Sequence, residues 1–328
     1  MFNPLARVER SSFTSGRDHA RVPTCSQELA CPLQHQHPVT AAPSRPLAVE
    51  GIHNLRGIGC HVAGRGTRVR AGLLYRSAAI DGATETGHQQ LADLGIKTVY
   101  DLRTSKERGT RRALAAPVRV VHLPVWAGDG EIGDVLATAT PDPDPVSSRP
   151  ERLLEAYGEE KTAIYTSIVR DHAGTFASLV AGLAQEGSLP AIVHCAAGKD
   201  RTGIAVAILL RLVGVPDTCI IADYLASRTF LSRARLEVYR PHLERLAIPE
   251  EDFLVPYGAH PPALKAALAE IDTTWGGVEA YLTGPGGLDP ALPEKLRSLL
   301  LEPDAPHAGG SPNGPASDAW SPLPLTPS

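Results

Sequence analysis

An apolar strand, a short polar loop and an apolar helix follow one another between residues 191 and 209, and this succession constrains the fold most. The segment reads AIVHCAAGKDRTGIAVAIL. Ile192 and Val193 favour a buried β-strand, whereas the residues from Ile204 onward favour a buried helix. Such a short apolar strand is typical of the centre of a parallel sheet that is covered on both faces. The loop after it holds a cysteine, a lysine, an aspartate and an arginine.

Strand-like and helix-like segments alternate around this motif. Further strands are predicted at residues 73–75, 96–103 and 118–125, where apolar and β-branched residues gather. Further helices are predicted at residues 85–95, 216–228, 230–246 and 262–282, the first of them ending at Gly95. The alternation predicts an α/β fold in which helices flank a mostly parallel central sheet.

The two ends of the chain differ in composition from its middle. Residues 1–47 are rich in Pro, Ser, His and Arg without periodicity, and residues 303–328 are rich in Pro, Gly and Ser. We interpret them as a disordered leader and a disordered tail around one domain at residues 48–302. Inside that domain, residues 127–150 are acidic and Pro-rich, which is typical of a functional lid or a disordered insertion.

Charge and hydropathy exclude several classes of protein. The net charge of −4 gives no general attraction to nucleic acid or to anionic membranes. No uncharged apolar run reaches the ~18 residues of a membrane span, and the charged N-terminus does not resemble a signal peptide. The five cysteines are too scattered for a disulfide framework. These features predict a cytoplasmic protein and leave secretion without a signal peptide open.

The polar loop fits the pattern H-C-x5-R-[ST]-G, which begins at His194. A loop between a strand end and a helix start can turn its backbone N–H groups inward and form an anion cradle. The helix N-terminus adds partial positive charge, and the planar Arg201 guanidinium can hold two phosphoryl oxygens at once. Small residues let the backbone approach the phosphate: Ala196, Ala197 and Gly198.

The same positive field favours ionisation of Cys195. Cysteines in such positions have pKa values of roughly 3.5–7.5, against about 8.5 for a free thiol. The loop is therefore predicted to hold an ionised nucleophile under a bound phosphate. Thr202 is expected to hydrogen-bond the sulfur when it leaves, and His194 to order the loop. The alternative interpretation is a buried structural cysteine before a polar helix start.

Details of the loop argue against other classes of phosphate-binding or cysteine-dependent protein. Asp200 follows Lys199 where a P-loop NTPase has Ser or Thr, and Val193 replaces the first glycine of that motif. A rhodanese-like sulfurtransferase also uses a loop cysteine, but the charged second half of this loop fits phosphate better. A non-catalytic phospho-binding protein is a further alternative, against which the presence of both Cys195 and Arg201 argues.

The segment HCAAGKDRTG resembles the signature loop of cysteine-dependent protein tyrosine phosphatases. It is especially similar to the loop of an atypical bacterial branch with a G-K-D-R sequence, which includes mycobacterial secreted phosphatases that also act on phosphoinositides. Further segments resemble blocks of that family in the same order: HNLRGIG, GLLYRSAAI, VYDLRTSKER, IADYLASR and AEIDTTWGGVEAYL. The resemblance extends from about Ile52 to Leu301. It departs from the family at Gly57, where Asp is usual.

The resemblance implies a protein tyrosine phosphatase that acts on phosphotyrosine proteins through a cysteinyl-phosphate intermediate. The reaction is expected to need neither a metal nor a cofactor. A phosphoinositide phosphatase with the same mechanism is the alternative, because Lys199 could attract the additional phosphates of a headgroup. The other interpretation of Lys199 is an exposed loop lysine that serves only general electrostatics.

The reaction also needs an acid that protonates the leaving oxygen. The resemblance suggests Asp200, which could instead cap the helix. Asp129 lies in the candidate lid, where a mobile acid would close over the substrate, although a solvated acidic loop is the other interpretation. Asp101 is expected to hold loops through Arg103 or the backbone, and Asp223 to pack or form an ion pair.

Overall fold

The structure is a computed structural model that describes residues 46–108, 118–126, 150–228, 240–246, 249 and 259–304, with only the backbone at residues 150–157. Most of the predicted leader, lid and tail lies outside the described residues. Asp129 and most of the predicted helix at 230–246 lie outside them as well.

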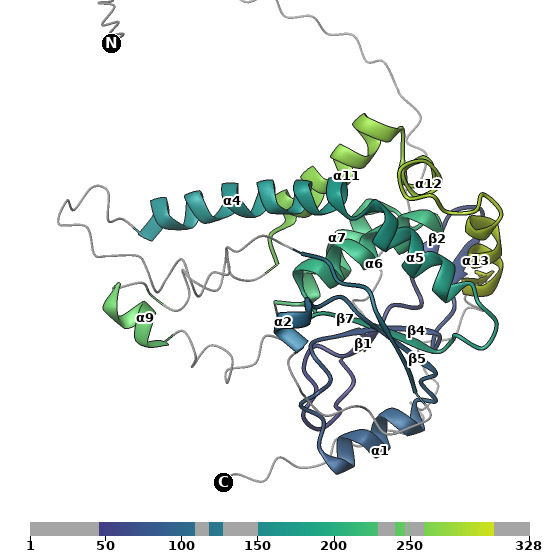
Figure 1. Cartoon of the computed structure of the whole chain (residues 1–328), viewed down its shortest axis with the longest axis horizontal. Helices are drawn as coiled ribbons and strands as arrows, with labels where there is room; N and C mark the ends of the chain where they lie inside the picture. The colour runs from purple at the N-terminus through teal and green to yellow at the C-terminus, as the bar shows by residue number, and fades with distance from the viewer. Residues whose placement is uncertain are drawn as a thin grey trace, which may run out of the picture. The chain divides into compact units, whose positions relative to one another are not determined.

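A central sheet of five strands has the order β1-β4-β7-β5-β6 (Figure 1). The strands are β1 (Arg56–Gly57), β4 (Leu74–Ser77), β7 (Ala191–His194), β5 (Thr98–Asp101) and β6 (Arg119–His122). Strands β4, β7, β5 and β6 run parallel, and β1 pairs antiparallel with β4. The apolar strand β7 lies at the centre of the sheet between β4 and β5, and all four of its residues are buried, as is typical of a central parallel strand. These observations confirm the predicted fold class.

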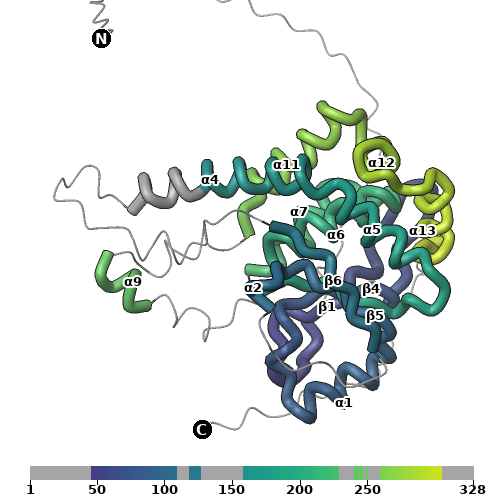
Figure 2. The backbone as a smooth tube through the Cα atoms, in the orientation of Figure 1, coloured from purple at the N-terminus to yellow at the C-terminus, as the bar shows by residue number. Residues whose placement is uncertain are grey.

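Side chains alternate along β7 and divide the core into two layers. Ile192 packs with Leu91 of α1 (Glu85–Asp93), whereas Val193 packs into the larger cluster on the opposite face. Seven helices contribute to the larger cluster: α4 (Pro150–Asp171), α5 (Ala173–Leu183), α6 (Asp200–Leu212), α7 (Asp217–Ala226), α11 (Pro261–Trp275), α12 (Val278–Thr283) and α13 (Leu292–Leu300). Figure 1 shows α1 below the sheet and α5, α6 and α7 above it. Helices α4 and α11 pack against each other over this upper layer (Figure 2).

Smaller elements complete the described part of the chain. Strands β2 (Val62–Ala63), β3 (Thr67–Val69) and β8 (Leu301–Pro303) form a separate antiparallel sheet. Short helices are α2 (Ser105–Arg108) and α9 (Arg240–Arg245). No helix in the described ranges is long and apolar enough to cross a membrane.

The structure differs from the helix prediction in two ways. The single helix expected at 262–282 is two helices, because Gly276 and Gly277 adopt φ values of 79° and 127° between α11 and α12. The sequence also did not predict the helices α2, α5 and α13, nor the 22-residue helix α4. Its later part presents an amphipathic face with buried Tyr165, Ile168 and Val169.

Candidate active site

Parallel pairing brings three strand ends to one edge of the sheet. The last residues of β4, β7 and β5 lie side by side in the register: Ser77, His194 and Asp101. The loop after β7 is fixed to both neighbours, because Ala79 N donates to Ala196 O at 3.1 Å and Leu102 N donates to His194 O at 2.8 Å. Cys195 therefore stands at the carboxyl edge of the sheet, where open α/β sheets bind ligands.

Buried side chains hold the carbonyl groups of the loop from behind. Asn54 Nδ2 donates to Ala197 O at 3.0 Å and to Gly198 O at 2.9 Å, and Arg76 Nη2 donates to Gly198 O at 2.9 Å. Gly198 has a φ of 67°, and a Cβ there would lie 2.2 Å from Ser77 O, so only glycine fits. Carbonyl groups fixed on this side favour N–H groups on the other side, where an anion would bind.

An ion cluster supports these donors. Asp223 of α7 accepts from Arg56 Nε at 3.0 Å and from Arg76 Nη1 at 2.5 Å, while Arg56 Nη1 donates to Asn54 Oδ1 at 2.5 Å. Burial raises the pKa of Asp223, but the charges of Arg76 and Arg56 outweigh burial and bring the pKa below its usual value. Of the two roles expected for Asp223, packing or an ion pair, the structure shows the ion pair.

The Cys195 thiol is buried and has a lowered pKa. Burial raises the pKa, but the positive charge of Arg201 and the hydroxyl and N–H of Thr202 lower it by more. The Thr202 hydroxyl is fully buried, yet it meets no described partner in normal hydrogen-bond geometry. Its effect on the sulfur is therefore that of a nearby dipole. The site favours a thiolate, which is the nucleophilic form of cysteine.

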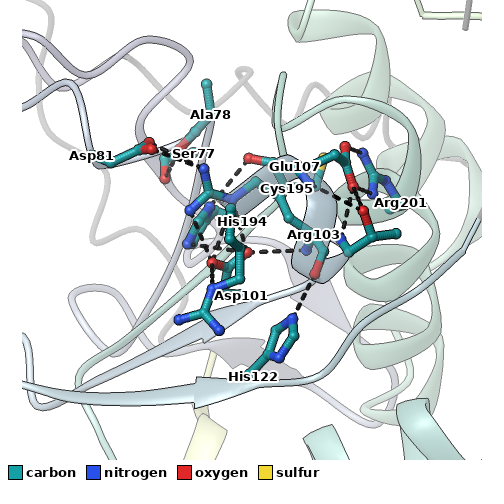
Figure 3. Close-up of polar contacts among 12 residues, drawn as sticks. Ser77, Ala78, Asp81, Asp101, Arg103, Glu107, His122, His194, Cys195 and Arg201 are labelled. Atoms are coloured by element: carbon teal, nitrogen blue, oxygen red, sulfur yellow. Dashed lines mark hydrogen bonds and ion pairs between the residues drawn. The ribbon is translucent and has the colours of Figure 1, made fainter. Parts of the chain in front are cut away.

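Glu107 of α2 fixes the Arg201 guanidinium (Figure 3). Arg201 Nη1 donates to Glu107 Oε2 at 2.6 Å, and Arg201 Nη2 donates to Glu107 Oε1. Burial raises the pKa of Glu107, but the Arg201 hydrogen bonds and charge outweigh burial and lower it, so the pair is ionic. The prediction missed Glu107, although it lies in the segment that resembles a family block.

His194 and Asp101 support the loop from the sheet side. His194 Nδ1 lies 3.1 Å from Cys195 O, and its Nε2 lies 3.7 Å from Asp101 Oδ1 (Figure 3). Asp101 Oδ1 accepts from the backbone N–H and from Nε of Arg103, both at 3.0 Å, as expected. Burial lowers the pKa of His194, which keeps its ring neutral and suits it to hydrogen bonding.

Asp200 lies in a cluster that the sequence did not reveal. Its Oδ1 is 3.1 Å from Lys161 Nζ and accepts from the Tyr165 hydroxyl at 2.5 Å, while its Oδ2 is 3.4 Å from Lys199 Nζ. Burial raises the pKa of Asp200, but the charges of Lys161 and Lys199 outweigh it and hold the pKa well below its usual range. Lys199 is only 2% exposed, so the interpretation as an exposed loop lysine is wrong.

A cysteine and an arginine at the carboxyl edge of an α/β sheet, joined by a short loop whose carbonyl groups are held from behind, are typical of proteins that bind phosphate beside a thiol nucleophile. Residues 47–302 match the tyrosine phosphatase family, and the chain belongs to that family. In the described part of this region, no group of three or more His, Cys, Asp or Glu side chains could hold a metal ion.

The chain is also similar in sequence to curated protein phosphatases from other bacteria. The triple specificity protein phosphatase PtpB of Mycobacterium tuberculosis is 28% identical over 268 residues, which cover 73% of this chain and 95% of PtpB. A tyrosine-protein phosphatase of Nostoc commune is 28% identical over 229 residues, covering 68% of this chain and 72% of that protein. Among solved structures, TpbA of P. aeruginosa is 19% identical and covers 58% of this chain and 95% of its own, with a TM-score of 0.26.

Proposed function

We propose that the chain hydrolyses phosphotyrosine in proteins by two successive displacements at phosphorus. In the first, the Cys195 thiolate forms an S–P bond while the bond from phosphorus to the phenolic oxygen breaks. In the second, water attacks phosphorus, the S–P bond breaks, and inorganic phosphate leaves. The observation that carries this proposal is the lowered pKa of the Cys195 thiol beside a loop whose carbonyl groups are held away from the anion side.

Each part of the loop has a role in this scheme. The backbone of residues 196–199 and Thr202 binds the phosphoryl oxygens that do not react. Arg201 holds two of these oxygens more strongly in the transition state than in the substrate, because its fork is already oriented by Glu107. The buried Thr202 hydroxyl stabilises the thiolate when it leaves in the second step.

The substrate class rests on the family and on the relatives, whose names include tyrosine-protein phosphatase. The phosphoinositide alternative would use cations near the loop to bind additional headgroup phosphates. Lys161 and Lys199 are 4% and 2% exposed and both contact Asp200, so neither extends into solvent. We therefore propose phosphotyrosine, and not a phosphoinositide, as the preferred substrate.

We also propose a cytoplasmic location, which the free thiols of Cys60, Cys195 and Cys219 support.

Activity measurements on the purified full chain test the proposal. In excess EDTA we expect hydrolysis of p-nitrophenyl phosphate and of a phosphotyrosine peptide, and we expect Cys195→Ser to abolish turnover while it still binds the peptide. The serine hydroxyl stays protonated at neutral pH, whereas the loop is unchanged. Turnover by Cys195→Ser would refute the mechanism. Binding without turnover by the wild-type chain would identify a phospho-binding protein, and a higher kcat/KM for a short-chain phosphoinositide would select the alternative substrate.

Asp200 is our candidate for the acid at the leaving oxygen, because it lies inside the loop and its side chain is 32% exposed. Asp129 is the alternative and lies outside the described residues. The lowered pKa of Asp200 poses a chemical problem, since a carboxylate that is ionised at neutral pH has no proton of its own to give.

A further inference from the structure

We propose that Lys161 supplies the proton that Asp200 delivers to the leaving oxygen, and that it takes the proton back when water attacks the intermediate. Lys161 thus acts through Asp200 as a positioning and proton-holding residue. The inference rests on the proposed function, since it assumes the phosphatase reaction at Cys195.

The placement of Lys161 on α4 is the first observation. It is 4% exposed and lies on the same helix face as the buried Tyr165 and Ile168. A lysine in such a position costs free energy compared with an apolar residue, because its ammonium group is removed from water. Its Nζ lies 3.1 Å from Asp200 Oδ1, a distance at which a proton can pass between them.

The second observation is the direction of the hydrogen bonds that reach Asp200. His260 N donates to the Tyr224 hydroxyl oxygen at 2.8 Å, and the Tyr224 and Tyr165 hydroxyl oxygens are 2.7 Å apart. Because Tyr165 donates its only proton to Asp200 Oδ1, Tyr224 must donate to Tyr165. The chain of donors therefore runs in one direction and ends at Asp200.

The two tyrosines in this series of hydrogen bonds, Tyr165 and Tyr224, hold their protons too tightly to serve as the acid. Burial and the negative charge of Asp200 raise the pKa of Tyr165 well above its usual value, and burial also raises that of Tyr224. Burial lowers the pKa of Lys161 to about 7, although Asp200 opposes that shift. Lys161 can therefore lose a proton near neutral pH, and it contacts the carboxylate directly.

Other charged and titratable groups also face Lys161 and enter its pH dependence. Lys199 of the loop lowers its pKa, and Asp200 at the start of α6 raises it. His260, before α11, feels the charge of Lys161 and also that of Arg228. Lys199 is the rival proton source, but its Nζ is 3.4 Å from the other carboxylate oxygen, Oδ2.

The protons balance over the two displacements. In the first, the leaving oxygen takes a proton from Asp200 as its bond to phosphorus breaks, and the Lys161 ammonium passes its own proton to the carboxylate. Lys161 is then a neutral amine. In the second, Asp200 accepts a proton from the attacking water and returns it to Lys161, while the Cys195 thiolate leaves phosphorus. The chain ends in the state in which it began.

The test compares the pH dependence of kcat/KM for phenyl phosphate, which needs the acid, and p-nitrophenyl phosphate, which needs it much less. Lys161 must be protonated to act, so the wild-type rate with phenyl phosphate should fall as pH rises through about 7. Lys161→Arg keeps the charge but does not titrate in this range. We expect it to remove that alkaline limb and to slow phenyl phosphate about 10²-fold, the lower end of general acid catalysis. The p-nitrophenyl phosphate rate should change far less.

Two comparisons sharpen the result. Lys265→Arg, at an exposed position on α11, is the matched control and should keep the wild-type profile. Lys161→Met, whose side chain has a similar volume, serves as the second variant if arginine does not fit at this position. It should also abolish the fall in the phenyl phosphate rate near pH 7. A limb that stays near pH 7 in the folded Lys161 variants, or that disappears only in Lys199→Arg, overturns the inference. Failure of the proposed function would look different, because the wild type would lack turnover that depends on Cys195.

Discussion

At the scale of single residues, the side chain that most directly shapes the loop is Asn54. It adopts a φ of 57°, a left-handed conformation that asparagine tolerates better than most residues. This conformation is compatible with an amide that donates to two successive loop carbonyl groups. The loop conformation on which the thiolate depends is therefore supported by a residue that lies more than a hundred positions earlier in the chain.

We predict that Asn54→Ala raises the Cys195 thiol pKa by about one unit and lowers kcat about tenfold, because two carbonyl groups lose donors worth about 1–3 kcal/mol each. The pH dependence of inactivation by iodoacetate measures the thiol pKa directly. Gln89→Ala, which removes a side-chain amide from the exposed face of α1, is the control. An unchanged thiol pKa in folded Asn54→Ala would show that the loop keeps its shape without this residue.

The residues of the loop itself could be predicted because their types and spacing form one local pattern. Asn54, Glu107 and Lys161 could not be assigned roles in the same way, since their partners are distant in sequence and no periodicity shows which side chain reaches them. One feature of the sequence does point to Lys161: it lies four residues before Tyr165, a buried tyrosine on an amphipathic helix. The role of Lys161 could be assigned only from the structure, which places this face of α4 over the loop.

At the scale of elements, the four parallel strands of the central sheet followed from the sequence, whereas the short antiparallel strands β1, β2, β3 and β8 and several helices did not. Strand β7 was predictable because three apolar residues precede the polar loop, and parallel sheets bury such strands. Helix α4 was missed because its first half is highly charged and follows an acidic, Pro-rich segment. The break at Gly276 was missed because a pair of glycines can also stand inside a helix at a moderate cost.

The shortest described helix near the site, α2, has a specific function in the proposed scheme, since it places Glu107 against Arg201. We predict that Glu107→Gln lowers kcat about tenfold and weakens phosphate binding, because a charge-assisted hydrogen bond contributes about 1.5–3 kcal/mol. Steady-state kinetics and inhibition by inorganic phosphate measure both effects. Glu186→Gln, at an exposed position, should match the wild type. A rise in KM alone would mean that Glu107 does not orient Arg201 for the transition state.

At the scale of the whole molecule, the Asp223 cluster joins parts of the domain that are far apart in sequence. Asp223 on α7 binds Arg56 and Arg76 across separations of 167 and 147 residues, and the side chains are at most 1% exposed. The cluster therefore connects the first strands of the sheet with the helix that follows α6. Removing one partner of such a buried cluster leaves uncompensated charge in the core.

We predict that Asp223→Asn lowers the free energy of unfolding by about 3–5 kcal/mol at neutral pH, because two buried arginines lose their anion. The pKa of Asp223 is lowered in the folded state, so its contribution is present above the usual carboxyl pKa and is lost as pH falls through the lowered value. Urea unfolding between pH 7 and pH 2 measures this, and the difference between variant and wild type should shrink only below about pH 4, near the usual carboxyl pKa. Asp272→Asn, which removes an exposed partner of Arg211, should cost at most about 1 kcal/mol. A difference that stays constant with pH would contradict this account.

The long separation between Asp223 and its two arginines also has a consequence during synthesis. A nascent chain that has left the ribosome only as far as residue 203 already carries every residue of the signature loop, yet it lacks the carboxylate that holds Arg56 and Arg76 in place. Without those anchors the loop loses its support, and we expect the cysteine to be an ordinary thiol that is largely protonated and slow to react with oxidants. We therefore expect the thiolate form of Cys195 to appear only when enough of the domain exists to enclose the loop.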